Sequence, residues 1–105
     1  ERLGLSGLSF QAGDITQASV TGPVHLTVSL HACDTATDAA LAQSVAWRAN
    51  VILAAPCCQH EIAATMNAPA LELIQSHGIL KERFAALATD ALRAAALEAA
   101  GYRTQ

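Results

Sequence analysis

Residues 24–61 read VHLTVSLHACDTATDAALAQSVAWRANVILAAPCCQHE, and this stretch decides the fold. Residues 24–30 are mostly apolar, contain β-branched side chains and follow a Thr-Gly-Pro turn, which predicts a buried strand. Residues 50–55 predict a second buried strand, which ends at Pro56 because proline cannot donate to a central ladder.

The segment between these strands predicts a helix that begins at Thr35. Thr35 and Asp38 fit a T-x-x-D capping box, and an acidic side chain suits the positive end of the helix dipole. Leu41 and Val45 are expected to face inward, near Trp47. A helical crossover between two apolar strands implies that the strands are parallel and that helices cover the sheet, so we expect an α/β fold.

The segment before residue 24 carries weaker signals. Residues 1–5 resemble the end of a helix, with Gly4 and Gly7 as breakers. The sequence LSF at 8–10 predicts a short strand followed by a turn.

The second half of the chain has a helical pattern. Residues 59–78 predict one or two short helices, interrupted at Pro69 and stopped by Gly78. Residues 80–100 predict the longest helix, with Gly101 as its C-terminal stop and the start of a strand at 102–105. The expected inward stripe of this helix has residues three or four apart, namely Leu80, Phe84, Leu87, Ala91 and Ala95, with Ala88 and Leu92 beside them.

Length and charge limit the classes of protein that this chain can represent. At 105 residues it is expected to form a single domain. A net charge of -3 with six basic residues argues against a broad phosphate-binding surface, which needs clustered lysine and arginine.

The cysteine count and the apolar runs predict the compartment. Three cysteines, two of them adjacent, do not form an even disulfide framework, so free thiols in the cytoplasm are expected. No apolar run approaches the roughly 18 residues of a transmembrane helix, and no signal peptide is recognisable, so no membrane partner is expected. Because the chain begins without methionine in what reads as a helix, we expect a piece of a longer protein.

Polar, chemically versatile side chains follow both predicted strands. His31, Cys33 and Asp34 come after the first, and Cys57, Cys58, His60 and Glu61 come after the second. In an open parallel sheet, ligands bind beyond the carboxyl ends of the strands. If the two strands are neighbours, these clusters therefore form one site.

The residue types leave three kinds of site open. A zinc site could use the H-x-C and C-C-x-H ligands, although their spacing matches known frameworks poorly. A cysteine nucleophile could be activated by His31 or His60. A cofactor pocket could use the small side chains and backbone amides against a bound nucleoside. Purely structural roles also fit, since Thr35 and Asp38 can serve only as a cap, cysteines can be packed residues, and Asp14 can be a turn residue.

The two motifs LHACDTATDAAL and VILAAPCCQHE, in this order, resemble the paired motifs of the methyltransferase 32 family of S-adenosylmethionine-dependent methyltransferases. A related H-x-C-G-x-A-T-D and C-C-H pattern occurs in certain tRNA 2′-O-methyltransferases. The resemblance extends over nearly the whole chain. It implies a Rossmann-like sheet, S-adenosylmethionine as cofactor and methyl transfer as activity, with RNA as a possible acceptor.

The resemblance also implies roles for individual residues. Asp14 and Ile15 would lie by the adenine, while His31, Ala32 and Cys33 would lie where the methionine moiety meets the acceptor. His31 and Asp34 are the expected catalytic residues, and no metal ligand is assigned. The expected substrate side contains Pro56, Cys57, Cys58 and His60.

Part of the sheet that the resemblance implies is absent. Residues 8–10, 24–30 and 50–55 would correspond to strands 3, 4 and 5, whereas strands 1, 2, 6 and 7 are missing. Residues 1–105 would then form one partial methyltransferase domain with weak cofactor binding. Its exposed strand edges would favour a homo-oligomer. A zinc-binding or non-catalytic interaction module is the alternative.

Overall fold

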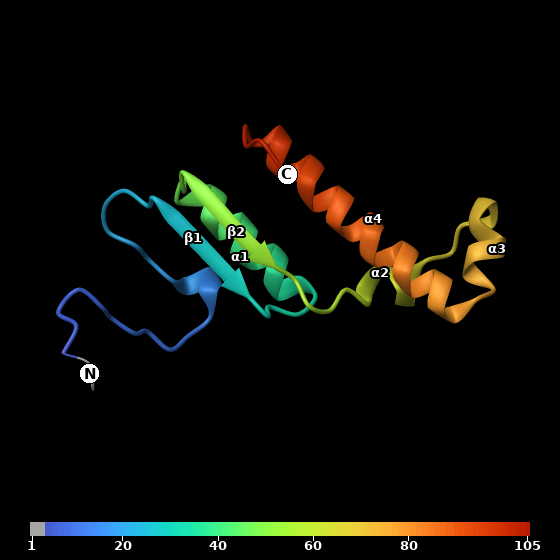
Figure 1. The fold of residues 1–105 in the computed structure, drawn as a ribbon, viewed down its shortest axis with the longest axis horizontal. Coiled ribbons are helices and arrows are strands. Elements are labelled where there is room, and N and C mark those ends of the chain that lie inside the picture. The colour runs from blue at the N-terminus through green and yellow to red at the C-terminus, as the bar shows by residue number, and fades with distance from the viewer. Residues whose placement is uncertain (1–3) are drawn as a thin grey trace.

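The computed structural model describes residues 4–105 as a mixed α/β fold with one small parallel sheet. Strand β1 (Leu26–Leu30) leads into helix α1 (Thr35–Ala46), which returns the chain to strand β2 (Val51–Ala55). The strands pair in parallel, with Leu26 opposite Val51 and Leu30 opposite Ala55. The predicted strand, helix and strand are therefore confirmed, and they form part of a Rossmann-like arrangement (Figure 1).

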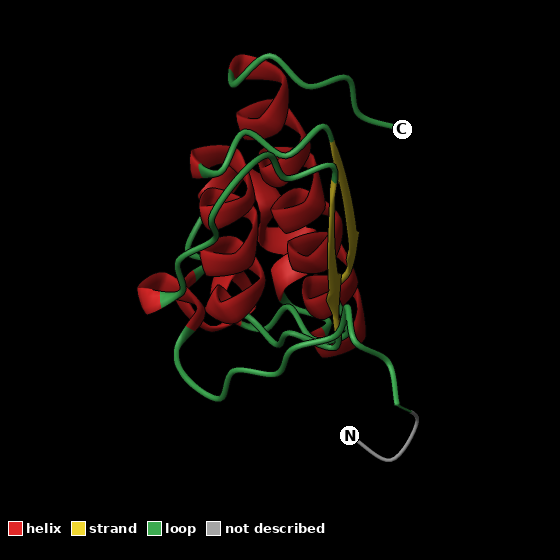
Figure 2. Ribbon diagram, turned by 90° about the vertical axis from the view of Figure 1, so that its left-hand side faces the viewer, coloured by secondary structure: helices red, strands yellow, loops and turns green. Residues whose placement is uncertain are grey.

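Helices lie on one side of this sheet, as the edge-on view in Figure 2 shows. The side chains of alternate strand residues share a face. On the covered face, Thr27, Ser29 and Ile52 are half-buried. On the opposite face, more than half of Val28 is exposed, at 54%. We call this opposite side the bare face, and the large apolar residues that form it are Leu26, Val28, Leu30, Val51 and Leu53.

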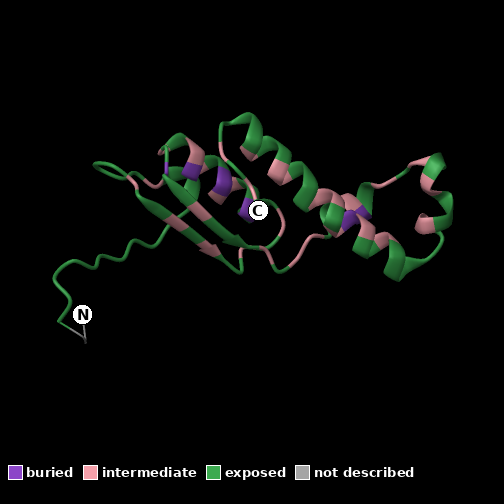
Figure 3. Ribbon diagram, turned by 45° about the horizontal axis from the view of Figure 1, so that its top comes forward, coloured by how far each residue is buried: buried purple, intermediate pink, exposed green. Residues whose placement is uncertain are grey.

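The second half of the chain forms a separate helical cluster. Its elements are α2 (Glu61–Thr65), the 3₁₀ turn η2 (Pro69–Leu71), α3 (Glu72–Gln75) and the long helix α4 (Gly78–Ala99). Both α2 and α3 pack on α4, where Ala63 and Ala85 are buried (Figure 3). Because alanine has no side chain beyond Cβ, the helix backbones can approach each other closely there.

The molecule is elongated rather than spherical. Its extents are 55 × 32 × 23 Å and its radius of gyration is 17.0 Å. A compact domain of this length has a radius of gyration of about 13 Å. The buried positions gather in two separate places, one around α1 and one where the helices of the second cluster meet (Figure 3). Contacts between the two clusters therefore matter for the geometry of any site that both supply.

Both long helices end in a Schellman motif. After α4, Gly101 has φ 94°, Gly101 N–H donates to the Glu98 carbonyl and Tyr102 N–H donates to the Leu97 carbonyl. The expected stop at Gly101 is confirmed. After α1, the left-handed position with φ 55° is taken by Arg48, which lacks the conformational freedom of glycine.

Several expectations about local structure are wrong. Residues 8–10 form no strand, and Phe10 is 82% exposed, because no neighbouring strand offers them a ladder. Residues 102–105 form no strand either, since the Tyr102 hydroxyl instead donates to the Ala49 carbonyl at 2.8 Å. The expected helix end at residues 1–5 lies mainly outside the described residues, and residues 4–5 are not helical.

The expected capping box does not form. Asp34 occupies the N-cap position of α1 without a side-chain cap, and the Asp38 carboxylate binds Arg93. Farther along the chain, Gly78 begins α4 instead of stopping the helix before it. Asp38 is turned away from Thr35 because a guanidinium lies within reach.

The predicted inward stripe of α4 is wrong for most of its members. Phe84 and Ala88 are half-buried, but Leu87 is 71% exposed. The helix packs through Ala85 because α2 and α3 approach the face on which this alanine lies. The other members of the predicted stripe, Leu80, Ala91, Leu92 and Ala95, are exposed.

Candidate active site at the strand ends

The turn after β1 brings two strained backbone positions to the carboxyl end of the sheet. His31 has φ 55°, and Asp34 has φ 47° with ψ −122°. Non-glycine residues with such angles cost on the order of 1–3 kcal/mol each and concentrate at active sites and ligand clamps. The turn is held by His31 N–H, which donates to the Ala55 carbonyl at 3.3 Å. Strain therefore lies where the sequence places the site.

Asp34 joins the ends of both strands. Its N–H donates to the Cys58 carbonyl at 3.2 Å, and its Oδ1 accepts from His60 N–H at 2.7 Å. Its carbonyl oxygen accepts from Arg93 Nη2 at 3.0 Å. The expected convergence of the two polar clusters is therefore confirmed, and Asp34 is its central hydrogen-bonding residue.

Arg93 connects α4 to this turn. Its Nε donates to Asp38 Oδ1 at 2.6 Å and its Nη2 donates to Asp38 Oδ2 at 3.2 Å, so the pair is bidentate. Asp38 is the main cause of a raised Arg93 pKa, since the carboxylate favours the charged guanidinium. The Nη1 atom is buried without a hydrogen bond, 3.6 Å from Asp90 Oδ1. Arg93 thus fixes the position of the strand-end turn relative to α4.

His60 is held toward α4 instead of the sulfur atoms. Its Nδ1 lies 3.1 Å from Glu82 Oε2, and this contact raises the pKa of the imidazole above its ordinary value of 6.5. Helix α2 begins at Glu61 with His60 as its N-cap residue, and it is one of the short helices predicted within residues 59–78.

The three cysteines come together between the strand ends. The Sγ atoms of Cys33 and Cys57 are 3.3 Å apart, and those of Cys57 and Cys58 are 3.8 Å apart. All three sulfur atoms lie within 4.8 Å of one another. Sharing of the thiol protons, first with Cys57 and then with Cys58, raises the pKa of the Cys33 thiol to about 12. The cysteines are therefore not independent packed residues.

Asp14 and Ile15 lie at a 3₁₀ turn, η1 (Ile15–Gln17), that contacts α1. The Asp14 carboxylate caps this turn by accepting from Thr16 N–H and from the Thr16 hydroxyl, both at 2.8 Å. These bonds, the backbone one first, lower the Asp14 pKa. Within residues 4–105, no hydrogen bond joins Asp14 or Ile15 to the strand ends. Their expected place beside an adenine stays a prediction.

Two backbone amides at the strand end have no hydrogen-bond partner among the described residues. No hydrogen bond in the described part of the chain uses the N–H groups of Ala32 or Cys33. The Ala32 carbonyl, in contrast, accepts from the buried hydroxyl of Thr37. Two adjacent donors on a fixed turn suit a carboxylate or hydroxyl group of a small molecule. The donor set therefore fits the methionine end of the cofactor that the sequence implies.

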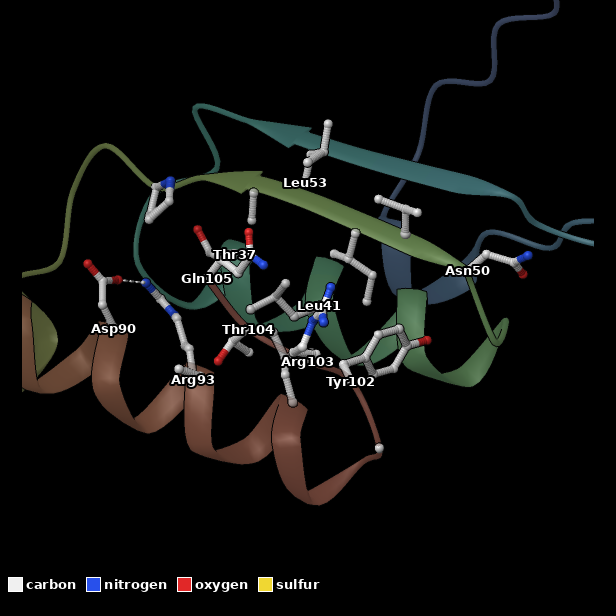
Figure 4. Close-up of a pocket in the computed structure, with 17 residues that line it drawn as sticks. Thr37, Leu41, Asn50, Leu53, Asp90, Arg93, Tyr102, Arg103, Thr104 and Gln105 are labelled. Carbon is white, nitrogen blue, oxygen red and sulfur yellow. Dashed lines mark ion pairs between the residues drawn. The ribbon is translucent and has the colours of Figure 1, made fainter.

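A cavity of about 840 Å³ lies between β2 and α4 (Figure 4). Arg93 and Asp90 line one end, Tyr102 lines the other, and Thr37 and Leu41 come from α1. Of the predicted site residues, the cavity includes Pro56 alone. The cavity borders the open edge of β2. None of the three cysteines lines it, so the cavity and the group of cysteines are separate features.

Sequence reasoning did not identify Arg93 or Glu82 as part of the site. Arg93 is bonded to residues 55 and 59 positions away in the chain, so no local motif contains both partners. One signal was present, because Arg93 is a lone charge in the apolar stretch ALRAAAL. A charged side chain on the buried face of a helix needs a polar partner, and in such a stretch that partner must come from another part of the chain.

The comparisons with known proteins identify one family. Residues 1–65 match the model of the methyltransferase 32 family, described as a methyltransferase domain. The matched segment includes β1, α1, β2 and α2, and with them both polar strand ends. No curated protein and no solved structure matches the chain.

Proposed function

Because this chain belongs to that family of methyltransferase domains, we propose that it transfers a methyl group from S-adenosylmethionine to an acceptor at the ends of β1 and β2. The observation that carries this proposal is the strained His31–Asp34 turn at the carboxyl end of the parallel sheet. Ligands of open parallel sheets bind at that position. The cofactor supplies an electrophilic methyl group on its sulfonium.

The residues of the turn have complementary tasks in this proposal. The amides of Ala32 and Cys33 hold the methionine end of the cofactor, and Asp14 with Ile15 border its adenine. The exposed imidazole of His31 accepts a proton from the acceptor. Asp34 holds the two strand ends together, since its Oδ1 accepts from His60 N–H at 2.7 Å, and its proposed task is to keep the turn that carries His31 in position.

The acceptor meets the second strand end. Pro56, Cys57, Cys58 and His60 border the space beside His31, and we propose RNA as the first acceptor to test because of the motif likeness to tRNA methyltransferases. Arg93, one of the six basic residues, is already paired with Asp38. Phosphate contacts would therefore come mainly from segments beyond this sheet.

We also propose that other strands complete the sheet, from a longer form of the protein or from a second copy. The two open sheet edges support this proposal, since exposed edges of buried-type strands invite pairing. The Cys33 and Cys57 sulfur atoms are 3.3 Å apart, so an oxidising compartment would convert the two thiols to a disulfide. We therefore propose that the protein works in a reducing compartment such as the cytoplasm. No helix within residues 4–105 has the length and apolar character needed to cross a membrane.

Calorimetric titration with S-adenosylhomocysteine tests cofactor binding, and transfer of a labelled methyl group to RNA tests the reaction. His31→Ala should lower kcat about 100-fold or more, the usual contribution of a positioned acid or base, with cofactor affinity unchanged. His77→Ala is the matched control, because His77 is exposed at the start of α4. Asp34→Asn keeps an oxygen for His60 N–H and isolates the effect of the charge. Absence of cofactor binding to the 105-residue chain and to a longer form would overturn the proposal in favour of a non-catalytic module.

A further inference from the structure

The thiol cluster is a set of soft ligands supplied by two separate segments. Cys33 follows β1, whereas Cys57 and Cys58 follow β2. Cys33 and Cys57 are exposed and Cys58 is half-buried, so an ion from solvent can reach the sulfur atoms. All three sulfur atoms lie within 4.8 Å of one another, close enough to share one ion.

The distances fit one metal ion. Two thiolates bound to the same tetrahedral zinc lie about 3.8 Å apart, given a Zn–S distance near 2.3 Å. The Cys57 and Cys58 sulfur atoms are 3.8 Å apart, and the Cys33 and Cys57 sulfur atoms are 3.3 Å apart. Adjustments of about 1 Å or less, which side-chain rotation of an exposed cysteine can supply, bring all three to that spacing.

We propose that Cys33, Cys57 and Cys58 bind one Zn²⁺ ion through three thiolates, with the fourth coordination position open to water or another ligand. This site differs from the zinc site considered from the sequence, in which His31 and His60 were candidate ligands together with the three cysteines. His60 Nδ1 is bonded to Glu82 at 3.1 Å, and neither His31 nor His60 belongs to the group of converging ligand atoms. Soft thiolates select zinc over magnesium or calcium, which prefer oxygen ligands.

Binding exchanges protons for the metal. Each thiol loses its S–H proton to buffer and donates an electron pair to zinc, so three thiols and one Zn²⁺ give an anionic complex and three released protons. Because zinc competes with these protons for the sulfur atoms, its affinity should rise steeply with pH.

The ion would tie together the carboxyl ends of the two strands. At present, Asp34 links them by its bonds to the Cys58 carbonyl and to His60 N–H. A metal bridge from Cys33 to Cys57 and Cys58 adds a second link at the same place. Any ligand that binds the folded protein selectively raises its melting temperature, so zinc should stabilise the fold.

The test uses reduced, metal-free protein. Titration with Co²⁺ as a spectroscopic probe should give sulfur-to-metal charge-transfer bands and tetrahedral d–d bands that saturate at one ion per chain, and Zn²⁺ should displace the cobalt. Loss of an outer-shell partner lowers metal affinity about 10–100-fold, so loss of a ligand in Cys33→Ser or Cys58→Ser should lower it at least about 100-fold. His31→Ala and His60→Ala are the controls, and both should retain wild-type affinity.

A measurement on the unmodified chain covers the case in which a cysteine variant fails to fold. Zn²⁺ should protect all three thiols from alkylation, and calorimetry in buffers of different ionisation enthalpy should show close to three protons released per ion. The proposal is overturned by saturation at one ion per two chains, by loss of metal in His60→Ala, or by full thiol reactivity with zinc present. None of these readouts depends on methyl transfer, so the metal site and the methyltransferase activity can fail separately.

Discussion

Replacement of Arg93 by alanine should strongly destabilise the protein, because this side chain is the main polar link between its two clusters. The guanidinium donates twice to Asp38 and once to the Asp34 carbonyl, and its side chain is only 10% exposed. Hydrogen bonds that involve a charged group contribute about 1.5–3 kcal/mol each to stability. Breaking a fully buried ion pair costs about 3–5 kcal/mol.

The expected loss lies below the sum of these contributions. Asp38 is 48% exposed, and it lies in the first turn of α1, so the carboxylate left behind is solvated and favoured by the helix dipole. We therefore expect Arg93→Ala to lower the free energy of unfolding by about 2–3 kcal/mol. For a domain of this length, each kcal/mol shifts Tm by about 4–8 °C, which gives a fall of about 10–20 °C.

Thermal unfolding followed by circular dichroism checks this prediction. Arg83→Ala removes the same charge from an exposed position of the same helix and should change stability by no more than about 0.5 kcal/mol. Arg93→Lys keeps the charge but not the planar fork, so its Tm should fall between those of the wild type and the alanine variant. The reasoning is refuted if Arg93→Ala and Arg83→Ala melt together, or if a double-mutant cycle with Asp38→Ala gives no coupling energy.

Three further outcomes are expected. Arg48→Gly should raise stability by about 0.5–1 kcal/mol in denaturant unfolding, because glycine adopts the left-handed C-terminal position without the cost borne by a side chain; a loss of stability would contradict this. The His60 pKa, measured by NMR, should exceed 6.5 in the wild type and return toward 6.5 in Glu82→Gln. The stabilisation from this pair is present below about pH 6.5 and is lost as the pH rises through the raised pKa. An unchanged His60 titration in the variant would contradict the pairing. Besides pairing at the strand edges, we propose that copies of the chain associate through the exposed apolar side chains of the bare face, so light scattering should detect oligomers that Val28→Lys dissociates, and a wild-type monomer would exclude this association.

The strands and the first helix could be predicted because their signals are local. Residues 26–30 and 51–55 carry apolar runs bounded by turn residues, and α1 begins at Thr35 as expected. Convergence of the two polar clusters also followed, since parallel neighbours bring their carboxyl ends to one edge. A short run of sequence thus contained the unit on which the site is built.

The partners of the charged residues could not be predicted in the same way. Asp38 has a local role available to it as a capping residue, and the sequence offers no means of weighing that role against a guanidinium 55 positions away. The inward face of α4 depends likewise on which helices reach it. Ala85 is buried while Leu87 is exposed, although hydrophobicity alone would predict the opposite. Tertiary contacts decide both cases.

The local order of the site does not depend on a complete sheet. Asp34 binds both strand ends, Arg93 holds its carbonyl, and the Thr37 hydroxyl fixes the Ala32 carbonyl, while the bare face has no cover within residues 4–105. The polar contacts described above for the strand-end turn come from residues 31–93. Strands that pair with the open edges would therefore add cofactor contacts to a turn that already has its final shape. This separation explains how the thiol cluster could bind a metal even in a form of the protein that binds the cofactor weakly.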